Sequence, residues 1–231
     1  MSFIKKTASF ILVVCLLCLL LAPAMAFSGV DIDILAEGAI LVDMETGDVL
    51  YEKNSHEKMY PASLTKIMTA LVVIENTTDY KEEHLVPNEA LNIEGSSMYL
   101  KQGEKLSVED LLYGLMLSSG NDSAVALAII TAGSEEKFVE MMNQKALSLG
   151  LKNTKFQNPH GLHHENHYTT AKDLAIITKE AMKNEMFKTI VLSKSKTVKG
   201  YTPNEPRLLI TKQKLLKENT LQKDNIEVTG V

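Results

Sequence analysis

The residues of this chain best suited to chemistry are a serine and a lysine three positions apart, Ser63 and Lys66. Pro61 disfavours helical backbone at Tyr60, and apolar residues recur at helical spacing from Ile67 onward, which predicts a helix that starts at the serine. Residues three apart share one helix face, so the lysine amine can reach the serine hydroxyl. Because a serine alcohol is a weak nucleophile until a base removes its proton, the spacing predicts a serine nucleophile with a lysine base.

The same pattern also has a purely structural interpretation. A serine at the start of a helix commonly caps the backbone amides, and a lysine one turn later is commonly solvated. In favour of catalysis, the open amides of the first turn create a positive potential, which disfavours a charged amine at Lys66 and favours negative charge developing near Ser63. The other motifs of the chain have to decide between the two interpretations.

A second polar group, Ser119-Gly120-Asn121, is expected in a turn between two helices. Serine, glycine and asparagine are common where one helix ends and the next is capped, which is the structural interpretation. In the functional interpretation Ser119 hydrogen-bonds Lys66 and relays protons, while Asn121 holds a substrate amide. The two interpretations are compatible, because such a turn fixes its side chains.

The hydrophobic pattern predicts the elements that position these groups. Two β-rich runs, 38–43 and 49–51, flank a glycine turn and indicate an N-terminal hairpin, and 189–201 and 207–211 are also β-prone. Helices are expected from Ser63, from Ser107, from near Asn121, from Ser134 to Gly150, and from Thr170 or Lys172 to Met182. Strands at both ends of a helical middle predict an α/β sandwich with helices packed on an antiparallel sheet.

The first residues, 1–26, are predicted to be a secretory signal peptide rather than part of the fold. Lys5 and Lys6 form a basic start, residues 10–21 are almost wholly apolar, and the small residues of Ala24-Met25-Ala26 allow cleavage after the last of them. The apolar run is shorter than the roughly 20 residues of a membrane-spanning helix, so no membrane anchor is expected after cleavage. We therefore expect the mature protein to be extracytoplasmic.

Composition excludes several classes of protein. Residues 27–231 have an ordinary composition and are enough for one large domain. Both cysteines, Cys15 and Cys18, lie in the predicted signal peptide, so no disulfide is expected in the mature chain. Removal of Lys5 and Lys6 lowers the formal net charge by two, from −5 to −7, which argues against a nucleic-acid partner.

Four histidines, His160, His163, His164 and His167, fall within eight residues, and clustered histidines can bind zinc. However, they are predicted to lie in a loop rather than at helical spacing, and no cysteine accompanies them. We therefore expect no metal ion and no other cofactor.

Together the motifs resemble those of low-molecular-weight penicillin-binding proteins of the D-alanyl-D-alanine carboxypeptidase family, whose signature combines Ser-x-x-Lys, a Ser-x-Asn-type element and Lys-Thr-Gly. A histidine before a Tyr-x-x-Ala-x-Asp-Leu stretch, here His167 before Tyr168, is also usual in that family. The resemblance covers most of the mature chain in the family's order, in the segments 41–47, 61–69, 117–124, 141–143, 149–154, 158–162 and 167–175.

The resemblance implies the transpeptidase fold of penicillin-binding proteins and β-lactamases, an antiparallel sheet with helices on its faces plus a helical subdomain. It implies that Ser63 attacks the amide between the terminal D-alanines of a peptidoglycan stem peptide once Lys66 has taken its proton. The last D-alanine would leave from an acyl-enzyme that water hydrolyses, with Ser119 as proton relay, Asn121 as substrate contact and the Ser63 amide as oxyanion donor. Penicillins mimic this peptide end, so β-lactams are expected to acylate Ser63 on the cell-wall side of the bacterial membrane.

The third family motif, Lys-Thr-Gly, is absent from the sequence. The run Lys199-Gly200-Tyr201-Thr202 comes too early to replace it, and the chain ends at Val231, where the motif is expected to begin. Residues 27–231 are therefore expected to be a partial catalytic domain, without the C-terminal sheet strands and the C-terminal β-domain. Loss of one oxyanion donor costs roughly 100- to 1,000-fold in rate, so we expect impaired catalysis.

Two other functions remain open from the sequence. A serine β-lactamase shares the first motifs, although no glutamate-bearing deacylation loop is recognisable and residues 158–175 resemble the carboxypeptidases. A non-catalytic protein that binds penicillin or peptidoglycan would keep the fold without the chemistry. The absent third motif favours that possibility, whereas intact Ser63, Lys66, Ser119 and Asn121 argue against it.

Overall fold

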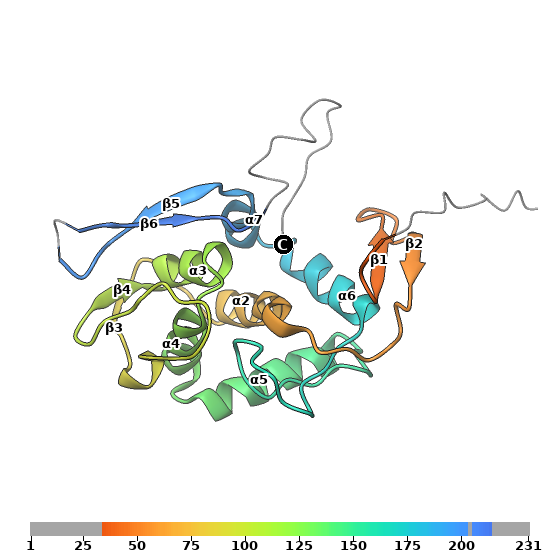
Figure 1. Cartoon of the computed structure of the whole chain (residues 1–231), viewed down its shortest axis with the longest axis horizontal. Coiled ribbons are helices and arrows are strands. Elements are labelled where there is room, and N and C mark those ends of the chain that lie inside the picture. The colour runs from red at the N-terminus through yellow and green to blue at the C-terminus, as the bar shows by residue number, and fades with distance from the viewer. Residues whose placement is uncertain (1–33, 203–204, 214–231) are drawn as a thin grey trace, which may run out of the picture. The chain divides into compact units, whose positions relative to one another are not determined.

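The computed structural model of the chain describes residues 34–202 and 205–213 (Figure 1). The chain divides into a short N-terminal unit, residues 1–35, and a main unit, residues 36–231, and the main unit is described here by itself. The predicted signal peptide lies outside the described residues and stays a prediction. Within the described part, none of the helices has the length and apolar character needed to cross a membrane.

The strands of the described residues pair in three separate two-stranded antiparallel sheets. The predicted N-terminal hairpin is confirmed, and its turn is closed by the Asp43 carboxylate, which accepts hydrogen bonds from the amides of Glu45 and Thr46. Gly47 completes the turn with φ of 82°, a conformation that glycine adopts without a steric penalty. The pairs are β1 (Ala39–Val42) with β2 (Val49–Lys53), β3 (Glu83–Leu85) with β4 (Lys105–Ser107), and β5 (Ser195–Val198) with β6 (Arg207–Ile210).

More residues of the described main unit lie in helices than in strands, and side chains cap several of the helices. Ser107, Ser134 and Thr170 each accept a hydrogen bond from a backbone amide in the first turn of the helix that follows. The α-helices are α2 (Thr65–Glu75), α3 (Val108–Leu117), α4 (Asn121–Ala132), α5 (Glu135–Ser148), α6 (Ala171–Ala181) and α7 (Glu185–Leu192), and 3₁₀ turns occupy Ala62–Leu64 and Asn88–Ala90.

Helix α2 is the centre of the hydrophobic core. Every residue from Thr65 to Ile74 is buried, because α3, α4, α5, α6 and α7 all contact this helix (Figure 1). Burial of a large apolar side chain contributes about 1.5–3 kcal/mol, and α2 supplies several. The residues at the start of α2 are therefore attached to the best-packed element of the described structure.

The structure corrects two details of the expected secondary structure. The β-prone stretch 189–201 begins inside α7, because Asn184 caps that helix and Phe187, Ile190 and Val191 are buried at helical spacing. The helix expected to start at Ser63 starts as α2 at Thr65, after the 3₁₀ turn. The predicted class, α/β with helices and antiparallel strands, is confirmed.

Candidate active site

Ser63 lies in the middle of the 3₁₀ turn that precedes α2, and its side chain is exposed. It caps neither the turn nor α2, since no side-chain cap hydrogen bond is made at either start. The preceding Ala62 has φ of 49°, an unusual backbone conformation for a residue with a Cβ. Gly161, with φ of 88°, packs so closely that a Cβ there would overlap the Ala62 carbonyl group. The loop that carries Gly161 therefore supports a strained turn that presents Ser63 to solvent.

Lys66 is buried, with 2% of its surface exposed, and its amine has three partners. Nζ lies 2.7 Å from Asn121 Oδ1, 2.7 Å from the carbonyl oxygen of His160 and 3.4 Å from Ser63 Oγ. Burial and, after it, the cation of Lys212 lower the pKa of Lys66 from 10.5 to about 8, although the Asp122 carboxylate acts in the opposite direction. This buried amine excludes the solvated lysine of the structural interpretation.

The two short contacts of Lys66 also indicate where its lone pair points. Both partners, Asn121 Oδ1 and the His160 carbonyl oxygen, are acceptors only, so each takes one N–H of the amine. A neutral amine has two N–H groups and one lone pair, which leaves the lone pair for Ser63 Oγ. The 3.4 Å separation is long for a hydrogen bond, as is common for catalytic contacts in a free enzyme. The arrangement suits removal of a proton from the serine.

Asn121 is the first residue of α4, and its carboxamide joins two parts of the site. Its oxygen accepts from Lys66 at 2.7 Å, and its nitrogen donates to the Glu94 carbonyl oxygen at 2.6 Å. Its backbone amide donates to the Ser96 carbonyl oxygen at 2.7 Å, which ties α4 to the 94–97 segment. In this structure Asn121 thus orients the Lys66 amine. The substrate contact predicted for it stays a prediction.

Ser119 lies in the turn between α3 and α4, as predicted, with φ of 56°. Among the hydrogen bonds of the described residues, none joins Ser119 to Lys66. The role of Ser119 as a proton relay remains a prediction.

A polar wall beside the site was not predicted from the sequence. The buried Asp122 carboxylate accepts hydrogen bonds from the Ser97 hydroxyl and from the amides of Met98 and Leu100. These contacts hold Tyr99 with φ of 62° and 78% of its surface exposed.

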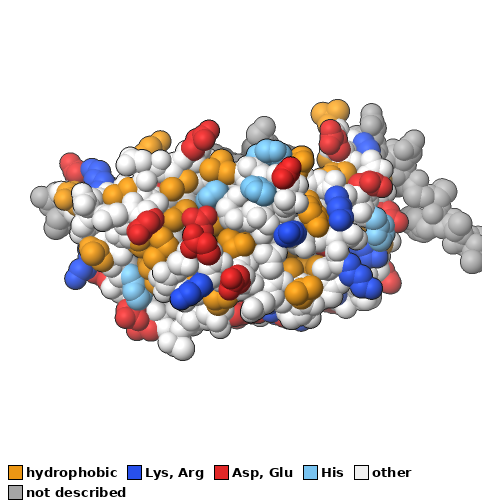
Figure 2. Space-filling view, turned by 90° about the horizontal axis from the view of Figure 1, so that it is seen from below, with side chains coloured by type: hydrophobic (Ala, Val, Ile, Leu, Met, Phe, Trp, Pro, Cys, Tyr) orange, Lys and Arg blue, Asp and Glu red, His pale blue; other side chains and the backbone are white. Residues whose placement is uncertain are grey.

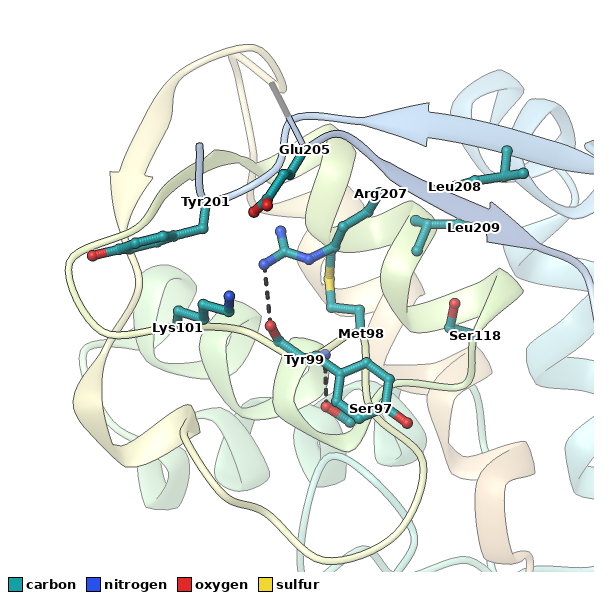
Figure 3. Close-up of a pocket in the computed structure, with 10 residues that line it drawn as sticks. All are labelled: Ser97, Met98, Tyr99, Lys101, Ser118, Tyr201, Glu205, Arg207, Leu208 and Leu209. Atoms are coloured by element: carbon teal, nitrogen blue, oxygen red, sulfur yellow. Dashed lines mark hydrogen bonds between the residues drawn. The ribbon is translucent and has the colours of Figure 1, made fainter. Parts of the chain in front are cut away.

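Arg207 of β6 fixes the other side of this wall. Its guanidinium makes a two-pronged ion pair with the buried Glu104 and donates to the Tyr99 carbonyl oxygen at 3.1 Å. Figure 3 shows this bond, with Arg207 reaching from β6 toward Tyr99 across a cavity of about 360 Å³. The cavity is also lined by Ser118, the residue before Ser119. Sequence spacing carried no signal for this pair, because the two partners are 103 positions apart.

Two of the four clustered histidines, His160 and His167, are buried, and Figure 2 shows the face of the molecule on which histidine side chains gather. Burial lowers the pKa of each of the two from 6.5 to about 4, and a second histidine contributes in both cases. Within the described residues no three side chains are arranged to hold a metal ion. From the sequence, His160 was a candidate zinc ligand and part of the family-like segment 158–162; the hydrogen bond from Lys66 to its backbone carbonyl oxygen was not predicted.

Comparison with known proteins identifies the family of the chain. The family model described as D-alanyl-D-alanine carboxypeptidase, Peptidase S11, matches residues 25–231. The D-alanyl-D-alanine carboxypeptidase DacF of Bacillus subtilis is 46% identical over 154 residues, which are 65% of this chain and 40% of that protein. DacC of Escherichia coli is 41% identical over 189 residues, which are 75% of this chain and 46% of that protein. The chain thus spans less than half the length of these curated relatives.

Solved structures show the same fold. A mutant of the Streptomyces K15 DD-transpeptidase superposes with a TM-score of 0.78 at 31% identity, over 87% of this chain and 80% of that one. Penicillin-binding protein 6B of Escherichia coli superposes with a TM-score of 0.76 at 34% identity, over 84% of this chain and 63% of that one. With a family model that matches nearly all of its residues, the chain belongs to the D-alanyl-D-alanine carboxypeptidase family of serine peptidases.

Proposed function

We propose that this protein is a serine-type D-Ala-D-Ala carboxypeptidase that removes the terminal D-alanine from peptidoglycan stem peptides. The observation that carries the proposal is the Lys66 amine, which is buried, has a pKa lowered to about 8, and is held by two carbonyl-type acceptors beside Ser63 Oγ. A lysine in this state is a base for a serine nucleophile at neutral pH. The names of the relatives supply the substrate class.

The chemistry follows from the positions of the groups. Lys66 takes the proton of the Ser63 hydroxyl while Ser63 Oγ attacks the carbonyl carbon of the penultimate D-alanine. The bond to the last D-alanine breaks, its nitrogen takes up a proton, and the remaining peptide stays on Ser63 as an ester. Water then hydrolyses the ester with Lys66 again as base. The Ser63 backbone amide serves as one oxyanion donor, Ser119 relays the proton and Asn121 contacts the substrate amide.

The same site accounts for sensitivity to β-lactams, which we also propose. A β-lactam amide presented like the D-Ala-D-Ala bond is opened by Ser63 in the same way, but its leaving group stays attached to the acyl group. The substrate is part of the cell wall, so the proposed function places the protein outside the cytoplasmic membrane. The predicted signal peptide, residues 1–26, supports that location.

Labelling with a fluorescent penicillin tests the proposal on the full chain. We expect a covalent adduct on the unaltered protein and none on Ser63→Ala. The matched control is Ser148→Ala, since the hydroxyl of Ser148 donates only to the Lys145 carbonyl oxygen at the end of α5. Labelling that persists in Ser63→Ala would refute Ser63 as the nucleophile.

Two further measurements separate the alternatives. The carboxypeptidase is supported if the protein releases D-alanine from a peptide that ends in D-Ala-D-Ala and if its penicillin adduct is long-lived. An adduct that disappears within seconds supports a β-lactamase, and a stable adduct without D-alanine release supports a penicillin-binding protein without turnover. Turnover at a rate typical of the family would contradict the expectation that a chain without Lys-Thr-Gly is impaired.

A further inference from the structure

We propose that His167 is a positioning residue for the Ser63–Lys66 pair and acts through the hydroxyl of Thr65. The inference rests on the proposed function of that pair and extends it to a residue outside the catalytic groups. Thr65 stands between the nucleophile and the base in sequence and is the first residue of α2. Its Oγ1 lies 2.8 Å from His167 Nε2, and both side chains are buried.

The direction of this hydrogen bond is determined by the other ring nitrogen. The backbone amide of Gln157 donates to His167 Nδ1 at 3.2 Å, so Nδ1 is the acceptor of a neutral imidazole. Nε2 therefore carries the proton and donates to Thr65 Oγ1. The ring also makes an edge-to-face contact with Phe156, with ring centroids 5.6 Å apart. These contacts leave the imidazole a single orientation.

His167 also belongs to a segment that holds the chain on the other side of Ser63. Thr169 exchanges two backbone hydrogen bonds with Met59, at 2.8 and 3.0 Å. Tyr168 exchanges two with Lys155 at the same two distances, which anchors the segment to the neighbouring loop. Segment 167–169 thus fixes the chain four residues before the nucleophile through the backbone and two residues after it through His167. The exposed turn that carries Ser63 is held at both ends by one short piece of chain.

This arrangement explains why a buried histidine is useful at position 167. The turn at Ala62 is strained, and the bond from His167 holds the Thr65 side chain at the point where this turn passes into α2. A small displacement of that turn would change the 3.4 Å separation of Lys66 Nζ from Ser63 Oγ. A displacement of about 1 Å can cost roughly 100-fold in rate.

A purely structural role for His167 predicts something different. In that case the imidazole only stabilises its own loop, through its contacts with the Gln157 amide and the Phe156 ring, and its bond to Thr65 has no effect on Ser63 and Lys66. The two roles depend on opposite nitrogen atoms of the same ring. Conservative substitutions can therefore separate them, because the amide nitrogen of a glutamine reaches the place of Nε2 and the amide oxygen of an asparagine reaches that of Nδ1.

The experiment compares His167→Gln with His167→Asn in the full chain. We expect His167→Gln to keep the penicillin acylation rate of Ser63 within about 3-fold, and His167→Asn to lower it about 10- to 100-fold, with similar losses of thermal stability. Thr65→Val, which removes the acceptor and keeps the shape of the side chain, should reproduce the slower rate. Thr178→Val is the matched control, since the Thr178 hydroxyl donates only to the Leu174 carbonyl oxygen within α6.

Titration of the Lys66 amine by NMR gives a readout that does not need acylation. His167→Asn should raise the pKa of Lys66 from about 8 toward 10.5, whereas His167→Gln should leave it near 8. Equal behaviour of the two variants in both measurements, or a better rate with asparagine, overturns the proposal, as does an unchanged rate in Thr65→Val. If the unaltered protein is not acylated, the proposed function fails, and the titration alone decides the role of His167.

Discussion

The protonation state of Lys66 determines whether Ser63 can act as a nucleophile, and the structure makes this state a measurable quantity. Burial and the cation of Lys212 lower the pKa of Lys66 from 10.5 to about 8. At pH 7 a lysine with a pKa of 8 is about 9% neutral, against about 0.03% for an ordinary lysine, which is an enrichment of roughly 300-fold. The acylation rate of Ser63 should follow the neutral fraction.

The assay is the rate of fluorescent-penicillin acylation between pH 6 and 9.5, with NMR titration of the Lys66 amine over the same range. We expect the rate to rise about tenfold per pH unit below pH 7.5 and to level off above pH 8.5. Lys66→Arg, whose guanidinium stays charged, should be inactive at every pH. A rate that is flat from pH 6 to 9, or a Lys66 pKa near 10.5, would refute the assignment of Lys66 as the base.

Three further predictions test other parts of the structure. Gly161→Ala should lower the free energy of unfolding by several kcal/mol and abolish acylation, because the added Cβ overlaps the Ala62 carbonyl group. The control is Gly150→Ala, which has a similar positive φ and nothing within 4 Å of the added Cβ, and which should cost only about 1 kcal/mol in urea unfolding. Glu104→Gln should destabilise the protein by about 3–5 kcal/mol, since it leaves Arg207 without its charged partner, and a loss below 1 kcal/mol in the same assay would contradict this. His160 and His167 have a pKa of about 4 in the folded protein and 6.5 when unfolded, so the unfolded state binds protons first as pH falls. The free energy of unfolding should therefore be highest above pH 6.5 and decrease by about 3 kcal/mol per histidine toward pH 4, and a His167→Gln variant should lose one of these two contributions.

Local pattern was enough to predict the elements that depend on neighbouring residues. The hairpin around Gly47 and the capped starts of α3 and α5 follow from turn residues and first-turn contacts a few positions apart. Residues 189–192 were less predictable. Their β-propensity favours a strand, but they form the end of α7, because the helix buries its apolar face in the core.

The candidate site divides in the same way. The proximity of Ser63 and Lys66 was predictable because a three-residue spacing brings side chains together in a 3₁₀ turn that continues into an α-helix, as it does within one helix. The His160 carbonyl and the Glu104–Arg207 ion pair were not, because backbone oxygens leave no trace in a sequence and the partners are 94 and 103 positions apart. Contacts between residues so far apart in the sequence can be found only in the structure.

The two acceptors that hold the Lys66 amine have a consequence for the order in which activity appears during folding. They come from positions 55 and 94 residues further along the chain, so neither can form before long stretches of the protein have closed on α2. A nascent or partly unfolded chain has an ordinary, charged lysine next to an inert serine. If Lys66 is the base, as we propose, the ability to activate Ser63 therefore appears only after these long-range contacts have formed, and α2 alone does not provide it.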